Sequence, residues 1–142
     1  MTLTLETART IVVEARAAAV EQDLKPIAVV VLDAGGHLVA AEREDGCSIK
    51  RFEIAKAKAY GALALGSGSR ALMVRAEQQP YFIAAATAVI GNELVPVPGG
   101  VLIRDSVGNL LGAVGISGDS SDNDERAAVA GIVAVSLAAQ TD

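Results

Sequence analysis

Lys58 is a basic residue that the sequence places among small, apolar neighbours. Residues three and four positions apart share one face of a helix, so Ala55 and Ala62 flank Lys58 on its predicted helix. A lysine that is partly buried in this way either pairs with an acidic side chain or has a lowered pKa. Two interpretations follow: a structural ion pair with Glu125 or Asp124, and a cation that binds a ligand carboxylate or transfers a proton.

The second interpretation of Lys58 leads to an enzyme hypothesis. Lys58 and Glu125 would be the acid–base pair of a small cofactor-independent isomerase, hydratase or lyase that acts on an organic acid by proton transfer. The backbone amides of Gly99 and Gly100 would stabilise an oxyanion or enolate. Other basic residues of the same segment are predicted to be solvated, because a charge run on a helix usually marks its outer face; they are Lys50, Arg51 and Lys56.

Residues 99–125 form the segment around which a ligand site is predicted. They read as a glycine pair, a strand, a turn, a second strand lined with small residues, a glycine-bounded loop and an acidic entry into a final helix. Such strand–loop–helix junctions bring backbone amides and acidic side chains together at one edge of a sheet, where a small ligand can be held. The predicted binding residues are Arg43, Cys47, Gly99, Gly100, Ser117, Gly118, Asp119 and Asp124.

The strand before the glycine-bounded loop has one face that shrinks toward its end. Period two places Leu111, Ala113, Gly115 and Ser117 together, which leaves room for a ligand or for the backbone of another element. Gly118 is then expected to adopt a conformation that other residues avoid. Helix capping accounts for some of the four following acids, and the others could pair with Lys58 or Arg43 or bind a cation; they are Asp119, Asp122, Asp124 and Glu125. Calcium-loop spacing is missing, so no metal site is predicted.

Residue types that ligate heme iron are few and scattered. They are His37, Cys47, Tyr60, Met73 and Tyr81, without a pair at a recognisable heme spacing and without a Cys-x-x-Cys-His motif. Cys47 is either a small residue near a helix start or a thiol whose pKa that helix end lowers. Nucleophile triads, phosphate loops and metal-ligand clusters are also missing, which disfavours hydrolase, kinase and metalloenzyme interpretations.

Composition limits the class of protein. A chain of 142 residues is predicted to be a single domain, residues 1–142, and its 51% hydrophobic and 3% aromatic content predicts a core of Ala, Val, Leu and Ile. The net charge of −5, with no basic stripe, disfavours a nucleic-acid partner. The sequence shows no export signal and no apolar run of membrane-spanning length, so a cytoplasmic location and no membrane partner are expected. The single Cys47 is compatible with a reducing compartment.

Hydrophobic periodicity and punctuation predict the elements that position these residues. Three longer helices are expected: one over residues 5–22 capped by Thr4, one from a Ser48 cap to near Gly66, and one from a capping box at residues 122–125 to about Ala139. Strands are expected at residues 27–32, 37–42, 101–104 and 110–116. A short helix capped by Ser69 is predicted over residues 70–77, and residues 78–92 are not assigned.

Two segments repeat the same turn chemistry. Residues 32–39 and 104–111 carry Asp, Gly and Leu at equal offsets, with Asp33 and Asp105 opening the turns. An Asp at this position bonds to the backbone two residues on, and the closing Gly tolerates positive φ. His37 occupies the place of Asn109, which favours a role at the turn exit over a role as a ligand. Helices alternating with hairpins predict an α/β or α+β domain with a mainly antiparallel sheet.

Several motifs in one order resemble the GlcG/HbpS family of heme-binding-protein-like domains. The resemblance spans nearly the whole chain and is carried by Asp33-Ala34-Gly35-Gly36-His37-Leu38 followed by Arg43, by Ala55, Lys58 and Ala59, by Gly99-Gly100-Val101, by residues 112–118 and by Asp124-Glu125. It implies a profilin-like fold, an α/β sandwich whose five-stranded antiparallel sheet is flanked by N-terminal, central and C-terminal helices. It also implies homo-oligomers, heme binding in several members and a corrinoid-related role in relatives fused to other domains.

Three functional classes remain open from the sequence. The first is a binding protein for heme or a small organic acid, which the resemblance favours. The second is the proton-transfer enzyme that would use Lys58 and Glu125. The third is an accessory subunit of an assembly in which the same residues form an oligomer contact. Alanine-rich helices with small exposed faces independently favour self-association.

Overall fold

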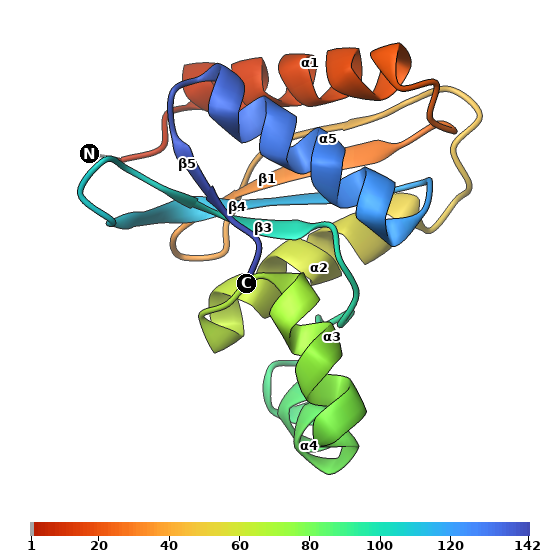
Figure 1. The fold of residues 1–142 in the computed structure, drawn as a ribbon, viewed down its shortest axis with the longest axis vertical. Coiled ribbons are helices and arrows are strands. Elements are labelled where there is room, and N and C mark those ends of the chain that lie inside the picture. Colours follow the sequence, from red (N-terminus) through yellow and green to blue (C-terminus); the bar gives the residue numbers. More distant parts are fainter. Residues whose placement is uncertain (1) are drawn as a thin grey trace.

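The computed structural model describes residues 2–142, which form a five-stranded antiparallel sheet with helices on both faces (Figure 1). The strands lie in the order β2-β1-β4-β3-β5. The helices are α1 (Leu5–Glu21), α2 (Arg51–Leu65), α3 (Ser69–Gln78), α4 (Pro80–Val89) and α5 (Ser121–Ala134), and the strands are β1 (Ala28–Asp33), β2 (Leu38–Arg43), β3 (Gly100–Arg104), β4 (Leu110–Ser117) and β5 (Ala138–Gln140). The predicted α+β class and five-stranded antiparallel sheet are confirmed.

The sheet separates two hydrophobic clusters. Helices α1 and α5 pack on one face, where Ile11 and Ile132 meet Ile116 of β4. Helix α2 packs on the other face through alanines such as Ala55 and Ala59. Small side chains let the backbone of a helix approach a sheet closely. The predicted small-residue core is therefore most evident on the α2 side, where alanines face the sheet.

The register of β3 against β4 shifts between Ile103 and Arg104. An irregularity of this kind adds one residue to one strand of the pair. The alternation of side chains between the two faces of the sheet therefore shifts by one residue on the far side of it. Leu111 therefore packs in the same cluster as Val114 and Ile116, on the α1 and α5 side of the sheet. The prediction that Leu111 shares a face with the small residues of β4 is wrong.

The two predicted hairpins form with the same turn chemistry. Asp33 Oδ1 accepts hydrogen bonds from the backbone N–H groups of Gly35 and His37, and Asp105 Oδ1 accepts from those of Val107 and Asn109. The closing glycines have φ values of 83° at Gly36 and 90° at Gly108. The side chains of His37 and Asn109 both return to their turn Asp. The predicted equivalence of the turns is confirmed.

Predicted helix caps are correct at one helix and wrong at three. Thr4 caps α1, as expected. Helix α2 begins only at Arg51, because the hydroxyl of Ser48 accepts from the Arg51 guanidinium instead of capping the helix. Gly68, rather than Ser69, is the N-cap of α3. Helix α5 is capped by Ser120, whose hydroxyl accepts from Asn123 N–H, so the predicted capping box at residues 122–125 is wrong.

The last helix is shorter than predicted. Helix α5 ends at Ala134, and Ser136 follows with a positive φ of 61°. Residues 138–140 then form the edge strand β5 beside β3. A left-handed residue interrupts a helix, and the free edge of β3 offers hydrogen-bond partners to the segment that follows.

The unassigned segment contains a further helix. Pro80 starts α4, consistent with the preference of proline for the first turn of a helix. Helices α3 and α4 pack against each other and project beyond the sheet as a helical arm, residues 69–89 (Figure 1). Leu72, Ile83 and Leu94 form its small separate core.

Candidate functional site

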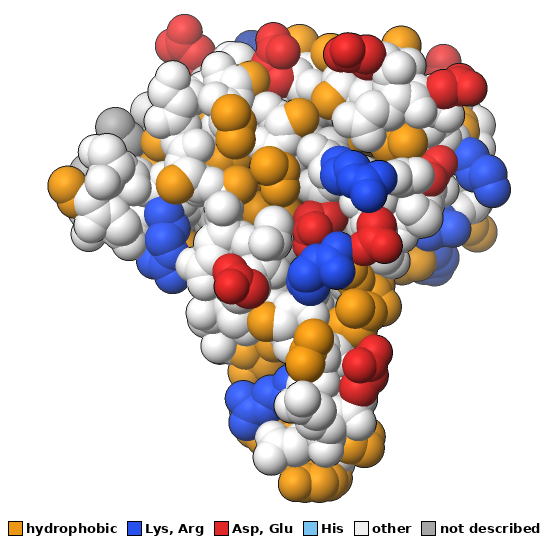
Figure 2. All heavy atoms as spheres, in the orientation of Figure 1, with side chains coloured by type: hydrophobic (Ala, Val, Ile, Leu, Met, Phe, Trp, Pro, Cys, Tyr) orange, Lys and Arg blue, Asp and Glu red, His pale blue; other side chains and the backbone are white. Residues whose placement is uncertain are grey.

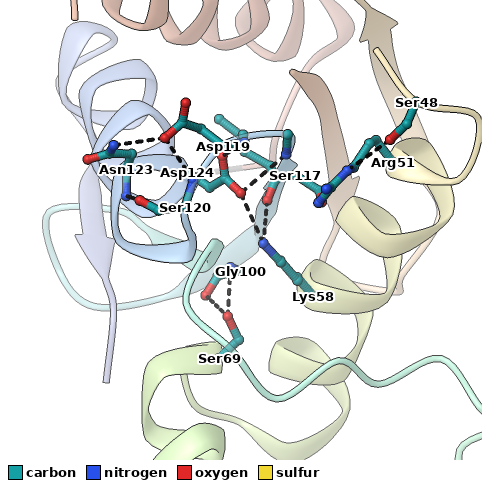
Figure 3. Close-up of polar contacts among 12 residues, drawn as sticks. Ser48, Arg51, Lys58, Ser69, Gly100, Ser117, Asp119, Ser120, Asn123 and Asp124 are labelled. Atoms are coloured by element: carbon teal, nitrogen blue, oxygen red, sulfur yellow. Dashed lines mark hydrogen bonds and ion pairs between the residues drawn. The ribbon is translucent and has the colours of Figure 1, made fainter. Parts of the chain in front are cut away.

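Lys58 lies at the junction of α2, β4 and α5 and is 2% exposed (Figure 3). Its ammonium donates to the carbonyl oxygen of Ile116 at 2.9 Å and forms an ion pair with Asp124 Oδ2 at 3.3 Å. The same carboxylate accepts from the backbone N–H groups of Gly118 at 3.3 Å and Asp119 at 2.9 Å. Asp124 therefore joins α2 to the loop that precedes α5.

Burial acts in opposite directions on the two charges of this pair. It lowers the pKa of Lys58 and raises the pKa of Asp124, and in each case the partner's charge opposes the effect of burial. Removal from water disfavours both charged forms, so the pair persists because each ion is compensated by the other and by backbone groups. Of the two interpretations of Lys58, the geometry fits a structural ion pair.

Glu125 lies next to Asp124 in sequence but has a different partner. Its carboxylate accepts from the guanidinium of Arg70 on α3, at 3.1 to 3.2 Å, and Asp122 accepts from the same guanidinium. These bonds attach the helical arm to α5. The hypothetical acid–base pair of Lys58 and Glu125 is therefore not assembled, because each of the two residues is bonded to another side chain.

The glycine pair at the start of β3, Gly99 and Gly100, sits against α2. A Cβ atom at Gly100 would overlap the carbonyl oxygen of Lys58, and one at Gly115 would overlap that of Ala55. The room that the small residues leave is thus filled by the backbone of α2. Gly99 has a φ of 125°, and the N–H of Gly100 donates to the Ser69 hydroxyl at 2.7 Å. The Gly100 amide thus already has an acceptor in the chain.

Ser117 is fully buried and bonded to a residue that sequence reasoning placed in solvent. Arg51 donates from Nη1 to Ser117 Oγ at 3.0 Å and from Nε to Ser48 Oγ at 3.1 Å (Figure 3). The prediction that Arg51 is solvated is wrong, because the arginine is half-buried and ties the start of α2 to the end of β4. A charge run alone could not reveal this, since Lys50 beside it is exposed.

Cys47 and Arg43 lie near the same end of the sheet. Arg43 donates to the backbone carbonyl oxygen of Cys47. The thiol of Cys47 is buried, and burial raises its pKa. This is opposite to the shift expected of a thiol acidified by a helix end, so the structure supports the interpretation of Cys47 as a small packed residue.

Gly118 differs from its predicted conformation. Its φ is not positive. The lack of a side chain at Gly118 instead permits close packing, since a Cβ there would overlap the carbonyl oxygen of Pro26.

Asp119 is held by three hydrogen bonds. Its carboxylate accepts from the backbone N–H of Lys25 at 2.8 Å, from that of Ser120 at 2.7 Å and from the Asn123 amide at 2.8 Å. These bonds lower the pKa of Asp119 to about 2.

The lowered pKa of Asp119 predicts a pH dependence of stability. Because the folded-state pKa is about 2 and the ordinary value is 3.8, the carboxylate stabilises the fold above about pH 4, and this contribution is lost as the pH falls toward 2. Asp119→Asn is expected to lower the urea midpoint at pH 7 and to match the wild type near pH 2. A difference between the two proteins that is equal at both pH values would contradict this origin.

His37 is the ligand-type side chain most open to solvent beside a cavity. Its side chain is 80% exposed, and Nδ1 lies 3.1 Å from Asp33 Oδ1. Hydrogen bonds from the turn, above all from the His37 backbone N–H, lower the pKa of Asp33, which keeps it an ionised acceptor. A cavity of about 320 Å³ adjoins the turn; its walls are Thr2, Leu3, Asp33, Ala34, Gly35, His37, Leu110 and Leu111.

The remaining heme-ligand types are less accessible or lie elsewhere. Tyr60 lines a smaller cavity of about 130 Å³ on the α2 side of the same turn. Met73 is half-buried on α3, and Tyr81 is exposed on α4. Within residues 2–142, no three or more His, Cys, Asp or Glu side chains gather in a group that could hold a metal ion. Over the same residues, no helix combines the length and apolar character needed to cross a membrane.

Comparison with known proteins places this arrangement in a family. Solved structures of the same fold include a complex of PduOC with heme (24% identity, 97% of this chain and 98% of that chain, TM-score 0.86) and a double mutant of Streptomyces reticuli HbpS (26% identity, 94% and 87%, TM-score 0.80). ORFY of Klebsiella pneumoniae is another (23% identity, 96% and 92%, TM-score 0.86). No protein with a curated description matches the sequence. The model of a family described as "Haem degrading protein HbpS-like" matches residues 3–133, and the chain therefore belongs to the HbpS-like family.

Proposed function

We propose that this protein binds a small organic ligand of the heme class, in the cavity beside the Asp33–His37 turn. The observation that carries the proposal is His37, which is exposed at the cavity wall while its Nδ1 is held by Asp33. Histidines that ligate metals usually donate their other ring N–H to a carboxylate or carbonyl group in this way. The family description and the heme complex of one structural neighbour support the same ligand class.

The residues of this cavity fit a heme group chemically. Leu3, Leu110 and Leu111 supply apolar walls, and His37 supplies a nitrogen ligand. Among residues 2–142, His37 Nε2 makes no hydrogen bond, so this nitrogen is available to iron. Bound heme would supply a redox-active iron; the chain itself would contribute apolar contact and hold the imidazole in position.

Two other surface cavities fit heme less well. The cavity of about 570 Å³ on α1 is larger, but its walls are side chains of that one helix and include no histidine, cysteine, tyrosine or methionine; they are Leu5, Glu6, Arg9, Thr10 and Val13. A heme there would lack an axial ligand from this chain. The cavity at Tyr60 is less than half the volume of the one at His37.

The second hairpin provides a matched variant for the test. Because Asn109 occupies the position of His37 and bonds to Asp105 as His37 bonds to Asp33, His37→Asn should preserve the turn while removing the iron ligand. We expect hemin to produce a saturable Soret shift with the wild type. His37→Asn should abolish the shift or weaken binding at least tenfold, which corresponds to about 1.4 kcal/mol.

Two controls make the hemin titration decisive. Tyr60→Phe and Cys47→Ser should bind hemin as the wild type does, since one side chain belongs to a different cavity and the other is buried. An unchanged Soret shift in His37→Asn would contradict ligation by His37. If the wild type gives no saturable shift, heme is the wrong ligand, and a panel of small carboxylates followed by thermal midpoint then tests the organic-acid alternative.

A further inference from the structure

Two arginines at one end of the sheet have no acidic partner. Arg43, the last residue of β2, donates to the backbone carbonyl oxygen of Cys47. Arg51, the first residue of α2, donates to the hydroxyl oxygens of Ser48 and Ser117 at 3.1 and 3.0 Å. Within residues 2–142 neither guanidinium takes part in an ion pair. Arginine stays protonated in proteins, so two positive charges are left without a counter-charge.

Most acidic side chains around this end of the sheet are bound to other bases. Asp45 lies in the loop between β2 and α2, where it is exposed and forms no ion pair within the described part of the chain. The other acids pair with bases other than Arg43 and Arg51: Glu42 and Glu44 with Arg16, Glu53 with Lys50, and Asp124 with Lys58. The chain therefore supplies no carboxylate to either arginine, and a bound anion would provide the missing negative charge.

The two guanidinium groups converge on one short segment of loop. Their acceptors include Cys47 and Ser48, which are consecutive residues. Arg43 and Ser117 also share one face of the sheet, because Ala28 of β1 lies directly opposite both. Burial raises the pKa of the Cys47 thiol, and both arginine charges oppose this rise, as positive charges near the sulfur do. One compact ligand can therefore contact both guanidinium groups.

Hydrogen-bond donors outnumber acceptors at this place. Arg51 uses Nε and Nη1, and Arg43 uses Nη2, so Nη2 of Arg51 and both Nε and Nη1 of Arg43 make no hydrogen bond among residues 2–142. The Ser48 hydroxyl accepts from Arg51, and its own hydrogen has no acceptor among the same residues. Arg43 and Ser48 are exposed and Arg51 is half-buried, so these donors are open to a ligand from solution.

Oxyanions match this arrangement of charge and donors, because guanidinium groups bind carboxylates and phosphates through paired N–H groups. Figure 2 shows Lys and Arg side chains along the right-hand edge of the molecule, beside the loops around the start of α2 in Figure 1. We propose that Arg43 and Arg51 form a binding site for a small dianion, a phosphate or a dicarboxylate, to which Ser48 donates a further hydrogen bond. Two uncompensated charges favour a dianion over a monovalent anion, and the net charge of −5 disfavours a nucleic acid.

The dianion site is separate from the cavity at His37. Arg43 lies opposite Ala28, the first residue of β1, whereas the turn that carries His37 follows Asp33, the last residue of that strand. The two sites therefore lie at opposite ends of β1. His37→Asn should bind a dianion as the wild type does, and failure of either proposal leaves the other unchanged.

Lys50 provides the matched control for Arg51. It is the neighbouring residue, carries the same charge and is exposed, with Glu53 as its partner. Isothermal titration calorimetry at pH 8 and constant ionic strength, with inorganic phosphate and separately with succinate, should show saturable binding of at least one of them to the wild type. Arg43→Gln and Arg51→Gln keep an amide donor but remove the charge, and each should weaken binding at least tenfold. Lys50→Gln should bind within about twofold of the wild type, since only general attraction changes.

The two probes identify the chemical class of the ligand, and three outcomes would overturn the proposal. Binding of phosphate alone or of succinate alone supports the site and assigns it to that class. The first contrary outcome is a wild type that binds neither probe saturably. The second is wild-type affinity in both Arg43→Gln and Arg51→Gln, with circular dichroism verifying that the variants are folded. The third is equal weakening by Lys50→Gln and Arg51→Gln, which would indicate general attraction to a basic surface.

Discussion

Replacing Asp124 by alanine is expected to remove about 3–5 kcal/mol of the free energy of unfolding, the loss typical of breaking a buried ion pair from one side. Asp124 is 1% exposed and is bonded to Lys58 and to the backbone N–H groups of Gly118 and Asp119. Alanine would leave a buried ammonium with the carbonyl oxygen of Ile116 as its remaining acceptor. Urea unfolding at pH 7, followed by circular dichroism, measures the loss.

A double variant separates the charge from the packing. Lys58→Met combined with Asp124→Asn removes both charges and keeps side chains of similar length, so it should be more stable than Asp124→Ala alone. Asp122→Ala is the surface comparison, because Asp122 is exposed and its partner Arg70 also bonds to Glu125; its cost should be below about 1 kcal/mol. A cost for Asp124→Ala as small as that for Asp122→Ala would show that the pair does not stabilise the fold.

Replacing Gly115 by alanine is expected to be about as harmful, although it adds only a methyl group. The new Cβ would overlap the backbone carbonyl oxygen of Ala55 and lie 3.1 Å from the Ala59 Cβ. Overpacking a core usually costs about 1–3 kcal/mol and sometimes more. The obstacle is the backbone of α2 rather than a movable side chain, so we expect a cost at or above the top of that range, seen as a lower urea midpoint or as insoluble protein.

Gly108 provides the comparison for Gly115. A Cβ at Gly108 would meet nothing within 4 Å, but its φ of 90° is unfavourable for alanine. Gly108→Ala should therefore cost only the backbone strain, about 1–3 kcal/mol. The Gly115 variant should be clearly the less stable of the two. Equal midpoints would mean that α2 can move away from β4 at little cost.

Features that depend on a few consecutive residues could be predicted from the sequence. The turns at Asp33 and Asp105 form because each carboxylate bonds to N–H groups two and four residues on, which is independent of the rest of the fold. Thr4 caps α1 for the same local reason. Lys58 was correctly placed among small residues, since the helical repeat fixes its neighbours.

Features that depend on distant segments could not be predicted in this way. Ala138 and Ala139 continue the apolar helical pattern, yet together with Gln140 they pair with the edge of β3. Arg51 belongs to a run of charged residues, yet it reaches the buried hydroxyl of Ser117, which lies 66 positions away. In both cases the partner is brought close only by the packed sheet, and no local pattern in the sequence records it.

Local patterns in the sequence predict the HbpS-like resemblance, the two Asp turns and a partly buried lysine that needs an acid. They could not choose between Asp124 and Glu125 as that acid. Consecutive residues of a helix point about 100° apart, so only the rotation of α5 against the sheet decides which one faces Lys58. In the tertiary structure Asp124 pairs with Lys58 and Glu125 pairs with Arg70, because α2 and the helical arm approach α5 from different sides.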